Sequence, residues 1–339
     1  APYFTSYIIK QLIELYGEEA TYTSGMRVHT SLNYELQQHA EKVVKKYIDY
    51  GSTPKWVKGQ KVPSLNYEQG AILALDPRTG YIKAIQGGAN FQNNEFNRVT
   101  QAKRQPGSAF KPFLYLTALQ KGFSPGSFIE DAPVTFNTIE GPYGPNNYTQ
   151  KYLGNIPMRK ALERSVNVIA IKLNYLIGPK HVVETAQNIG ITSPLKPILS
   201  LPLGANEVTM IELASAYGVF ANNGKRVEPT GIISIEDRDG SPLYEHKIVE
   251  RRVFNANLIS TLVDMMKGIV KYGTGRNAKL PRPVAGKTGT TSDYRDAWFF
   301  GFVPQLVCAT WVGNDDNSPT YKMTGGWVPA SMWREFMKE

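Results

Sequence analysis

A serine and a lysine three residues apart, Ser108 and Lys111, have the types and spacing of a nucleophile and its base. They lie in the stretch QPGSAFKP at residues 105–112, where Pro-Gly predicts a turn that opens a helix. A separation of three puts both side chains on one helical face, and Pro112 is tolerated only in the first helical turn. Ser108 would then lie at a helix N-terminus, where free N–H groups favour developing negative charge. The pair could form an activated nucleophile of the Ser-Lys kind.

A second polar pair, Ser165 and Asn167, interrupts the segment 161–170, which is helical in composition on both sides. Serine and asparagine are poor residues for the middle of a helix because they compete for backbone hydrogen bonds. The pair therefore predicts a turn between two helices, aimed at a site. The alternative is an ordinary turn, since the same Ser-x-Asn pattern occurs at residues 31–33 and 64–66.

A third group lies in the run VAGKTGTT at residues 284–291. Lys287 with the hydroxyls of Thr288 and Thr290 could bind an anion, and Gly289 would let the backbone of a ligand approach the strand. A phosphate-binding loop is excluded because the G-x-x-x-x-G-K-[ST] spacing is absent. Lys-Thr-Gly occurs once in the chain, whereas Ser-x-x-Lys also occurs at residues 52–55 and 193–196. Both of those copies contain proline and lie in polar, turn-rich surroundings.

Charge and composition exclude several classes of function. The 38 Lys and Arg outnumber the 29 Asp and Glu, for a formal net charge of +9, which favours contact with anionic polymers. The basic residues are scattered, so a solvated surface is favoured over nucleic-acid binding. Cys308 stands alone in an apolar run and predicts a buried thiol. No metal or cofactor is expected, because no metal-ligand spacing links the histidines, which are His29, His39, His181 and His246.

Membrane and targeting signals are missing from this sequence. No apolar stretch approaches the ~20 residues of a membrane span, and no signal peptide opens the chain. The abrupt start at Ala1 leads us to expect that the chain is the middle of something longer.

Periodicity predicts an α+β fold whose two ends meet. Strands are expected at both ends of the main domain and helices in its middle, so both ends must share one sheet. Residues 51–64 are the candidate boundary after a small α+β appendage, and 123–152 is expected to be a long loop without regular structure. The expected helices are 4–16, 33–50 with Asn33 as N-cap, a helix from 209 to 220, 257–270 and 330–338; the expected strands are 25–32, 70–75, 81–85, a hairpin within 232–248, 284–291, 297–303 and 306–313.

Ser-x-x-Lys, Ser-x-Asn and Lys-Thr-Gly, in this order, form the motif set of class A β-lactamases and penicillin-binding proteins. Together with residues 98–102, 273–276 and 295–299, they make the chain resemble the transpeptidase domain of bifunctional class A penicillin-binding proteins. Residues 1–66 resemble the linker to an upstream glycosyltransferase, which leaves 67–339 as the transpeptidase domain. The resemblance covers essentially the whole chain.

The resemblance implies a serine β-lactamase/D,D-peptidase-like fold. This fold has a five-stranded antiparallel sheet flanked by helices, an all-helical subdomain, and here a small N-terminal α+β linker region. The active site would lie between the edge of the sheet and the helical part. The implied location is extracytoplasmic, with a transmembrane anchor outside this chain. The implied partners are peptidoglycan stem peptides, the upstream glycosyltransferase and, as covalent inhibitors, β-lactam antibiotics.

The roles that the resemblance implies describe acyl transfer. Ser108 would attack the penultimate D-Ala carbonyl of a stem peptide while neutral Lys111 takes its proton. Burial and the nearby cation Lys287 should lower the Lys111 pKa, as a lysine base requires. The implied catalytic residues are Ser108, Lys111, Ser165, Asn167 and Lys287; Thr288, Gly289 and Thr290 would bind the substrate or β-lactam; the backbone N–H groups of Ser108 and Thr290 would form the oxyanion hole.

Two departures argue against a β-lactamase. The middle residue of the second motif is Val166 rather than Asp, and the sequence has no convincing Glu-x-x-x-Asn loop to supply a deacylating base. We therefore expect a penicillin adduct that persists for many minutes. Three alternatives remain: a D,D-carboxypeptidase, which would transfer the acyl group to water, a non-catalytic β-lactam sensor or wall-binding relative, and a basic polymer-binding module. The resemblance of residues 1–66 to a linker favours the transpeptidase.

Overall fold

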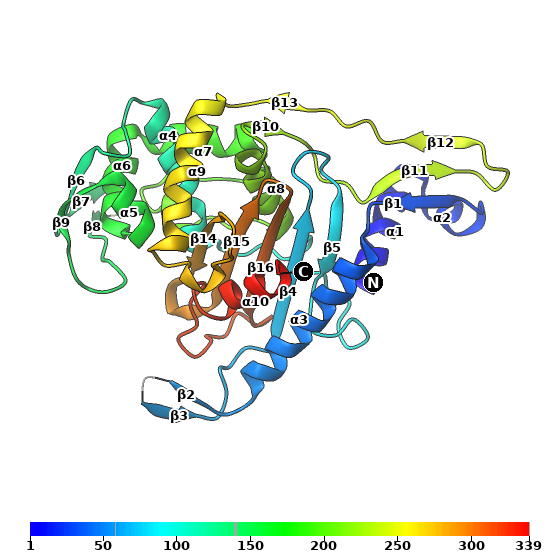
Figure 1. Cartoon of the computed structure of the whole chain (residues 1–339), viewed down its shortest axis with the longest axis horizontal. Helices are drawn as coiled ribbons and strands as arrows, with labels where there is room; N and C mark the ends of the chain where they lie inside the picture. Colours follow the sequence, from blue (N-terminus) through cyan, green and yellow to red (C-terminus); the bar gives the residue numbers. More distant parts are fainter. Residues whose placement is uncertain (58, 139–140, 339) are drawn as a thin grey trace.

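The computed structural model describes residues 1–57, 59–138 and 141–338 (Figure 1). At its centre is the expected five-stranded antiparallel sheet, in which two strands from the start of the main domain lie beside three strands from its end. This arrangement confirms that the two ends of the domain meet in one sheet. The order across the sheet is β14 (Ala285–Thr290), β15 (Asp296–Val303), β16 (Leu306–Gly313), β4 (Gln69–Leu75) and β5 (Ile82–Gln86).

The sheet is buried on both faces, and alternate residues of β4 supply two different cores. Leu73 and Leu75 lie in the larger core, which also contains residues of α8 (Met210–Ala221). Ile72 and Ala74 lie in the smaller core with α3 (Tyr34–Ser52) and α10 (Val328–Phe336). Successive side chains of a strand point to opposite faces, so a continuous apolar run is the pattern of a strand covered on both sides.

The helical subdomain surrounds α4 (Lys111–Gln120), all of whose residues except the last are buried. Helices α6, α7 and α9 contact α4, and α9 also contacts the edge strand β14. The expected helical part of the domain is thus present beside that edge (Figure 1), but it is not all-helical, because the short strands β6 (Phe128–Asp131) and β9 (Gly154–Pro157) pack against α6 and α5. The bounds of its other helices are α5 (Met158–Arg164), α6 (Asn167–Ile177), α7 (Pro179–Ile189) and α9 (Ala256–Lys271).

The N-terminal region packs into the main domain, whereas the sequence suggested an appendage. Tyr3, Phe4 and Ile8 are buried in the larger core, and α3 covers one face of the sheet, with Asn33 capping it as expected. The first strand also pairs with β11, which forms the predicted hairpin with β12. These strands form an arm that extends away from the body (Figure 1). The bounds are α1 (Pro2–Tyr16), α2 (Glu18–Thr23), β1 (Arg27–Thr30), β11 (Ile232–Glu236) and β12 (Pro242–Glu245).

Two segments that were expected to be irregular contain short strands. Within 51–64, β2 pairs with β3, and within 123–152, β7 pairs with β8, while β6 of this segment pairs with β9, which lies just after it. These strands have three or four residues, too few to give a periodic signal. Residues 58 and 139–140 of these segments lie outside the described part. The remaining elements are β2 (Lys55–Val57), β3 (Gln60–Val62), β6 (Phe128–Asp131), β7 (Phe136–Thr138), β8 (Gly141–Tyr143), β9 (Gly154–Pro157), β10 (Lys225–Arg226), β13 (Arg251–Arg252), η1 (Gly107–Phe110), η2 (Leu201–Leu203), η3 (Arg276–Ala278) and η4 (Ser292–Tyr294).

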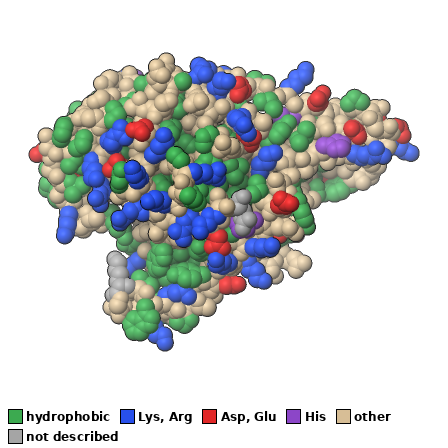
Figure 2. All heavy atoms as spheres, viewed as in Figure 1, with side chains coloured by type: hydrophobic (Ala, Val, Ile, Leu, Met, Phe, Trp, Pro, Cys, Tyr) green, Lys and Arg blue, Asp and Glu red, His purple; other side chains and the backbone are tan. Residues whose placement is uncertain are grey.

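Figure 2 shows Lys and Arg side chains spread over the viewed face, with Asp and Glu side chains among them. The basic residues on this face are therefore dispersed, as the sequence indicated. None of the helices within residues 1–57, 59–138 and 141–338 has the length and apolar character needed to cross a bilayer.

Candidate active site

The candidate nucleophile lies in a turn that is pressed between two other segments. Ser108 is half-buried in the 3₁₀ turn η1, and α4 begins at Lys111, so one tight turn precedes the predicted helix. Gly107 has a φ of 57°, and a Cβ built on it would lie 2.5 Å from the carbonyl oxygen of Thr290. On another side, a Cβ on Gly204 would lie 2.3 Å from the backbone nitrogen of Gly107. We call residues 106–110 the nucleophile turn.

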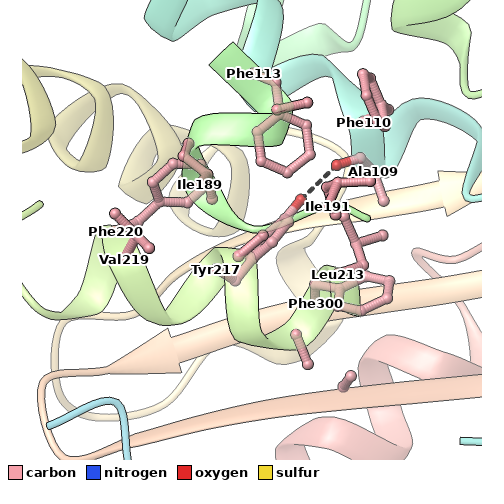
Figure 3. Close-up of a cluster of buried hydrophobic side chains, with 14 of the residues drawn as sticks. Ala109, Phe110, Phe113, Ile189, Ile191, Leu213, Tyr217, Val219, Phe220 and Phe300 are labelled. Carbon is pink, nitrogen blue, oxygen red and sulfur yellow. Dashed lines mark hydrogen bonds between the residues drawn. The ribbon is translucent and has the colours of Figure 1, made fainter. Parts of the chain in front are cut away.

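A buried tyrosine supports the same turn from below (Figure 3). Tyr217 of α8 donates a 2.7 Å hydrogen bond from its hydroxyl to the carbonyl oxygen of Ala109. Its ring packs 5.2 Å from the ring of Phe300 in the sheet and 6.4 Å from that of Phe113 in α4. The sequence analysis missed Tyr217 and Gly204, because nothing local to them points to residues about 100 positions away.

Gly289 lies directly against the nucleophile turn. A Cβ on Gly289 would lie 2.3 Å from the carbonyl oxygen of Pro106 and 3.2 Å from the Cβ of Ala109. The nucleophile turn therefore occupies the face of β14 on which this side chain would lie. The missing side chain lets the turn approach the strand there.

Two buried lysines from different elements meet at the hydroxyl of Ser165. Lys111 Nζ donates to Ser165 Oγ at 3.2 Å, to the Ser165 carbonyl oxygen at 2.7 Å and to Asn167 Oδ1 at 2.7 Å. Lys287 Nζ, from β14, donates to Ser165 Oγ at 2.9 Å and to the carbonyl oxygen of Thr288 at 3.1 Å. The structure thus brings Lys111 of the first motif, Ser165 and Asn167 of the second, and Lys287 of the third into direct contact.

The electrostatic setting of these lysines favours their neutral forms. Both side chains are fully buried, and the hydrogen-bond acceptors just described are all neutral oxygens. Burial, and then the cation Lys287, hold the pKa of Lys111 well below its usual range. Burial lowers the pKa of Lys287 to about 7. A neutral amine has two N–H groups and a lone pair, so in this form the Ser165 hydroxyl donates to Lys111 Nζ across the 3.2 Å contact. Such an amine can accept a proton near neutral pH.

The turn between α5 and α6 has the predicted position and a strained backbone. Ser165 adopts the left-handed conformation, with φ 56° and ψ 40°, and the Val166 N–H donates to the carbonyl oxygen of Ala161 at 2.9 Å. A non-glycine residue in this region costs on the order of 1–3 kcal/mol, and such residues cluster at functional sites. Here the conformation directs both oxygens of Ser165 at the Lys111 amine.

The Ser108 hydroxyl is not hydrogen-bonded to Lys111 in the described part of the chain. The amine of Lys111 instead donates to Ser165 and Asn167. Contacts between a nucleophile and its base are often long without substrate and tighten when it binds. The two residues nevertheless lie one turn apart on the same segment, as their spacing predicted.

The two threonines of β14 are joined to segments outside the motif. Thr288 Oγ1 lies 2.8 Å from Thr274 Oγ1, and Thr290 Oγ1 accepts a 3.1 Å hydrogen bond from the Gly325 N–H. Thr274 belongs to the stretch 273–276 that the resemblance already singled out, whereas no signal in the sequence pointed to Gly325. Because Thr290 Oγ1 accepts the Gly325 N–H, its own O–H can still donate to a ligand.

Two features flank this centre. The hydroxyls of Tyr148 and Tyr294 lie 3.2 Å apart and join the helical subdomain to the turn that follows β14. A cavity of about 360 Å³ is lined by residues that include Gln105, just before the nucleophile turn, and Thr291, just after β14. Neither feature includes a residue of the three motifs.

Comparisons with known proteins agree with this geometry. Residues 70–338 match the family described as penicillin binding protein transpeptidase domain. The chain is 34% identical to penicillin-binding protein 2D of Bacillus subtilis, over 100% of this chain and 49% of that protein. It is 40% identical to penicillin-binding protein 1A of Aquifex aeolicus, over 84% of this chain and 40% of that protein. The chain therefore spans half or less of the length of these curated relatives.

Among solved structures, the chain is similar to the PonA1 protein of Mycobacterium tuberculosis in complex with penicillin V. The TM-score is 0.86 at 25% sequence identity, and the match covers 99% of this chain and 92% of that one. The backbone arrangement described above is thus shared over the whole length of the chain.

Proposed function

Because the chain belongs to the penicillin-binding protein transpeptidase family, we propose that it is a serine D,D-transpeptidase that cross-links peptidoglycan stem peptides. The observation that carries the proposal is the Ser165 hydroxyl shared by two fully buried lysines beside the nucleophile turn. This arrangement supplies a nucleophile, a base with a lowered pKa and a path for a proton.

In the first step, Ser108 Oγ attacks the penultimate D-Ala carbonyl of a donor stem peptide, and its proton passes to neutral Lys111. The lowered pKa of Lys111 supports this role. The N–H groups of Ser108 and Thr290 would stabilise the oxyanion, each contributing about 3–4 kcal/mol. The close approach of Gly107 to the backbone of Thr290 supports this pairing.

In the second half of acylation, the peptide C–N bond breaks and the terminal D-Ala leaves as an amine. Its nitrogen must gain a proton, and Ser165 would relay one from Lys111 through the 3.2 Å contact. The amine of a second stem peptide then attacks the ester carbon and gives a proton to Lys111, which returns a proton to Ser108 Oγ as the ester C–O bond breaks. The product is a new amide bond, the cross-link.

The remaining residues would hold the donor. Lys287, Thr288 and Thr290 would bind its terminal carboxylate, and Asn167 its amide. An arriving carboxylate would favour the charged form of Lys287, whose pKa is lowered by burial to about 7 in the absence of a partner charge.

β-Lactams would acylate Ser108 in the same way and persist. Val166 stands where a β-lactamase has Asp, and the glutamates of the two Glu-x-x-x-Asn stretches, Glu163 and Glu184, lie in helices α5 and α7 and not in a loop that could supply a deacylating base. The resemblance to a protein solved with penicillin V supports this.

Residues 1–66 would link the domain to an upstream glycosyltransferase, and the whole protein would be anchored on the outer side of the cytoplasmic membrane. The share of the relatives' length that lies outside this chain leaves room for both.

The test is intact-protein mass spectrometry after incubation with benzylpenicillin, with Ser108→Ala as control. We expect one stable adduct on the wild-type chain and none on the variant. An adduct that survives in Ser108→Ala, or no adduct on a folded wild-type chain, would refute the proposal. Incubation with a stem-peptide donor and an amine acceptor then separates cross-linking from hydrolysis, because the two products differ in mass.

A further inference from the structure

We propose that Asn147 and Asp131 are positioning residues that aim the Asn167 amide at the ligand. This inference rests on the proposed function, in which Asn167 holds the amide of the donor. Both residues lie in the segment 123–152, which was expected to be a loop, and neither belongs to a motif that the sequence analysis singled out. The segment would thereby determine how well the site recognises the amide group next to the scissile bond.

Asn147 caps the helix that carries Asn167. Its Oδ1 accepts hydrogen bonds from the backbone N–H of Asn167 at 3.0 Å and of Val168 at 3.2 Å. The first N–H groups of a helix have no partner within the helix, and the N-cap residue of α6, Val166, offers no side-chain acceptor. A residue 20 positions earlier in the chain therefore fixes where α6 begins.

Asp131 fixes the orientation of Asn147. Asn147 Nδ2 donates to the two carboxylate oxygens of Asp131 at 2.8 and 3.0 Å and to the carbonyl oxygen of Lys151 at 3.0 Å. The carboxylate is fully buried and also accepts a 2.8 Å bond from the Leu153 N–H. A carboxylate accepts and an N–H donates, so only one orientation of the Asn147 amide satisfies both sides.

The side chain of Asn167 keeps one N–H group available for a ligand. Its Oδ1 accepts from Lys111 Nζ at 2.7 Å, and its Nδ2 donates to the carbonyl oxygen of Asn146 at 3.1 Å. An amide nitrogen carries two N–H donors, which leaves one for a ligand carbonyl. The same short segment thus holds both the backbone of Asn167, through Asn147, and its side chain, through Asn146.

Replacing Asn147 by alanine removes the cap and leaves the buried Asp131 carboxylate without its side-chain donor. The start of α6 would shift, and the free N–H of Asn167 would move with it. A misplacement of about 1 Å costs on the order of 100-fold in rate. Because the lost contact is to a ligand amide, the loss should depend on whether the ligand has one.

The experiment measures the second-order rate of Ser108 acylation by two penicillins. Benzylpenicillin carries a side-chain amide, and 6-aminopenicillanic acid has an amine there. In Asn147→Ala we expect the rate with benzylpenicillin to fall on the order of 100-fold and the rate with 6-aminopenicillanic acid by less than about tenfold. The matched control is Asn155→Ala, since Asn155 is an exposed asparagine of β9, the partner strand of the one that carries Asp131. It should leave both rates unchanged.

Equal losses with both ligands would mean that Asn147 only supports the fold and would overturn the inference, as would no loss at all. If Asn147→Ala does not fold, Asp131→Asn, which removes the paired carboxylate acceptor, is judged by the same ratio of the two rates. A wild-type chain that neither penicillin acylates would refute the proposed function instead. A wild-type chain that is acylated, with an unchanged ratio in the folded variant, refutes the positioning role alone.

Discussion

Replacing Gly289 by alanine would place a methyl carbon 2.3 Å from the carbonyl oxygen of Pro106 and 3.0 Å from the Cβ of Trp298. A carbon and an oxygen in normal contact lie about 3.3 Å apart, so the strand and the nucleophile turn must separate by about 1 Å. The backbone of Gly289 does not have a positive φ, so the methyl group is resisted by its neighbours and not by local strain.

The separation should have two effects. Overpacking of a tight contact costs about 1–3 kcal/mol of unfolding free energy. Displacing Ser108 by about 1 Å relative to β14 should lower the acylation rate on the order of 100-fold. If the space above Gly289 instead served only a ligand, the substitution would lower acylation without destabilising the protein.

The assay pairs the time course of benzylpenicillin adduct formation with the free energy of unfolding from denaturant titration. Gly126→Ala is the matched control, since the nearest atom to its new methyl group would be 3.8 Å away. The control should keep both the wild-type rate and the wild-type stability. A Gly289→Ala protein that acylates at the wild-type rate, or is as stable as the wild type, would show that the turn is not held against the strand as described.

Two further predictions concern the lysines. Lys111→Met should slow acylation of a folded protein by about 10²–10⁴-fold. The wild-type acylation rate should fall as the pH drops through the lowered pKa of Lys111, because the amine becomes protonated. A Lys111→Met protein that forms the adduct at the wild-type rate, measured by mass spectrometry, would exclude Lys111 as the base. Burial lowers the pKa of Lys287 from 10.5 to about 7, so between these values the unfolded chain holds a proton that the native chain lacks, and the stability due to this group rises with pH. In denaturant titrations, the free energy of unfolding should therefore rise less between pH 7 and pH 9 for Lys287→Met than for the wild type. An equal rise in both proteins would contradict the lowered pKa of Lys287.

Local sequence signals determined much of this protein. The turn before Ser108, the turn at Ser165 and the cap at Asn33 each depend on residues within a few positions of one another, and all three are present. The paired hairpin strands and the long amphipathic helices follow from periodicity over single segments. The order of three motifs also sufficed to indicate the family and the fold.

Tertiary structure alone decided how these parts act together. Lys111 and Lys287 share one hydroxyl because the edge strand of the sheet lies against the helical subdomain, and their lowered pKa values come from burial by both. Tyr217 and Gly204 support the nucleophile turn, and Asn147 caps a helix from another segment. Contacts of this kind depend on which surfaces meet after folding. The energy of burying a group depends on all its neighbours, most of which are distant in the sequence.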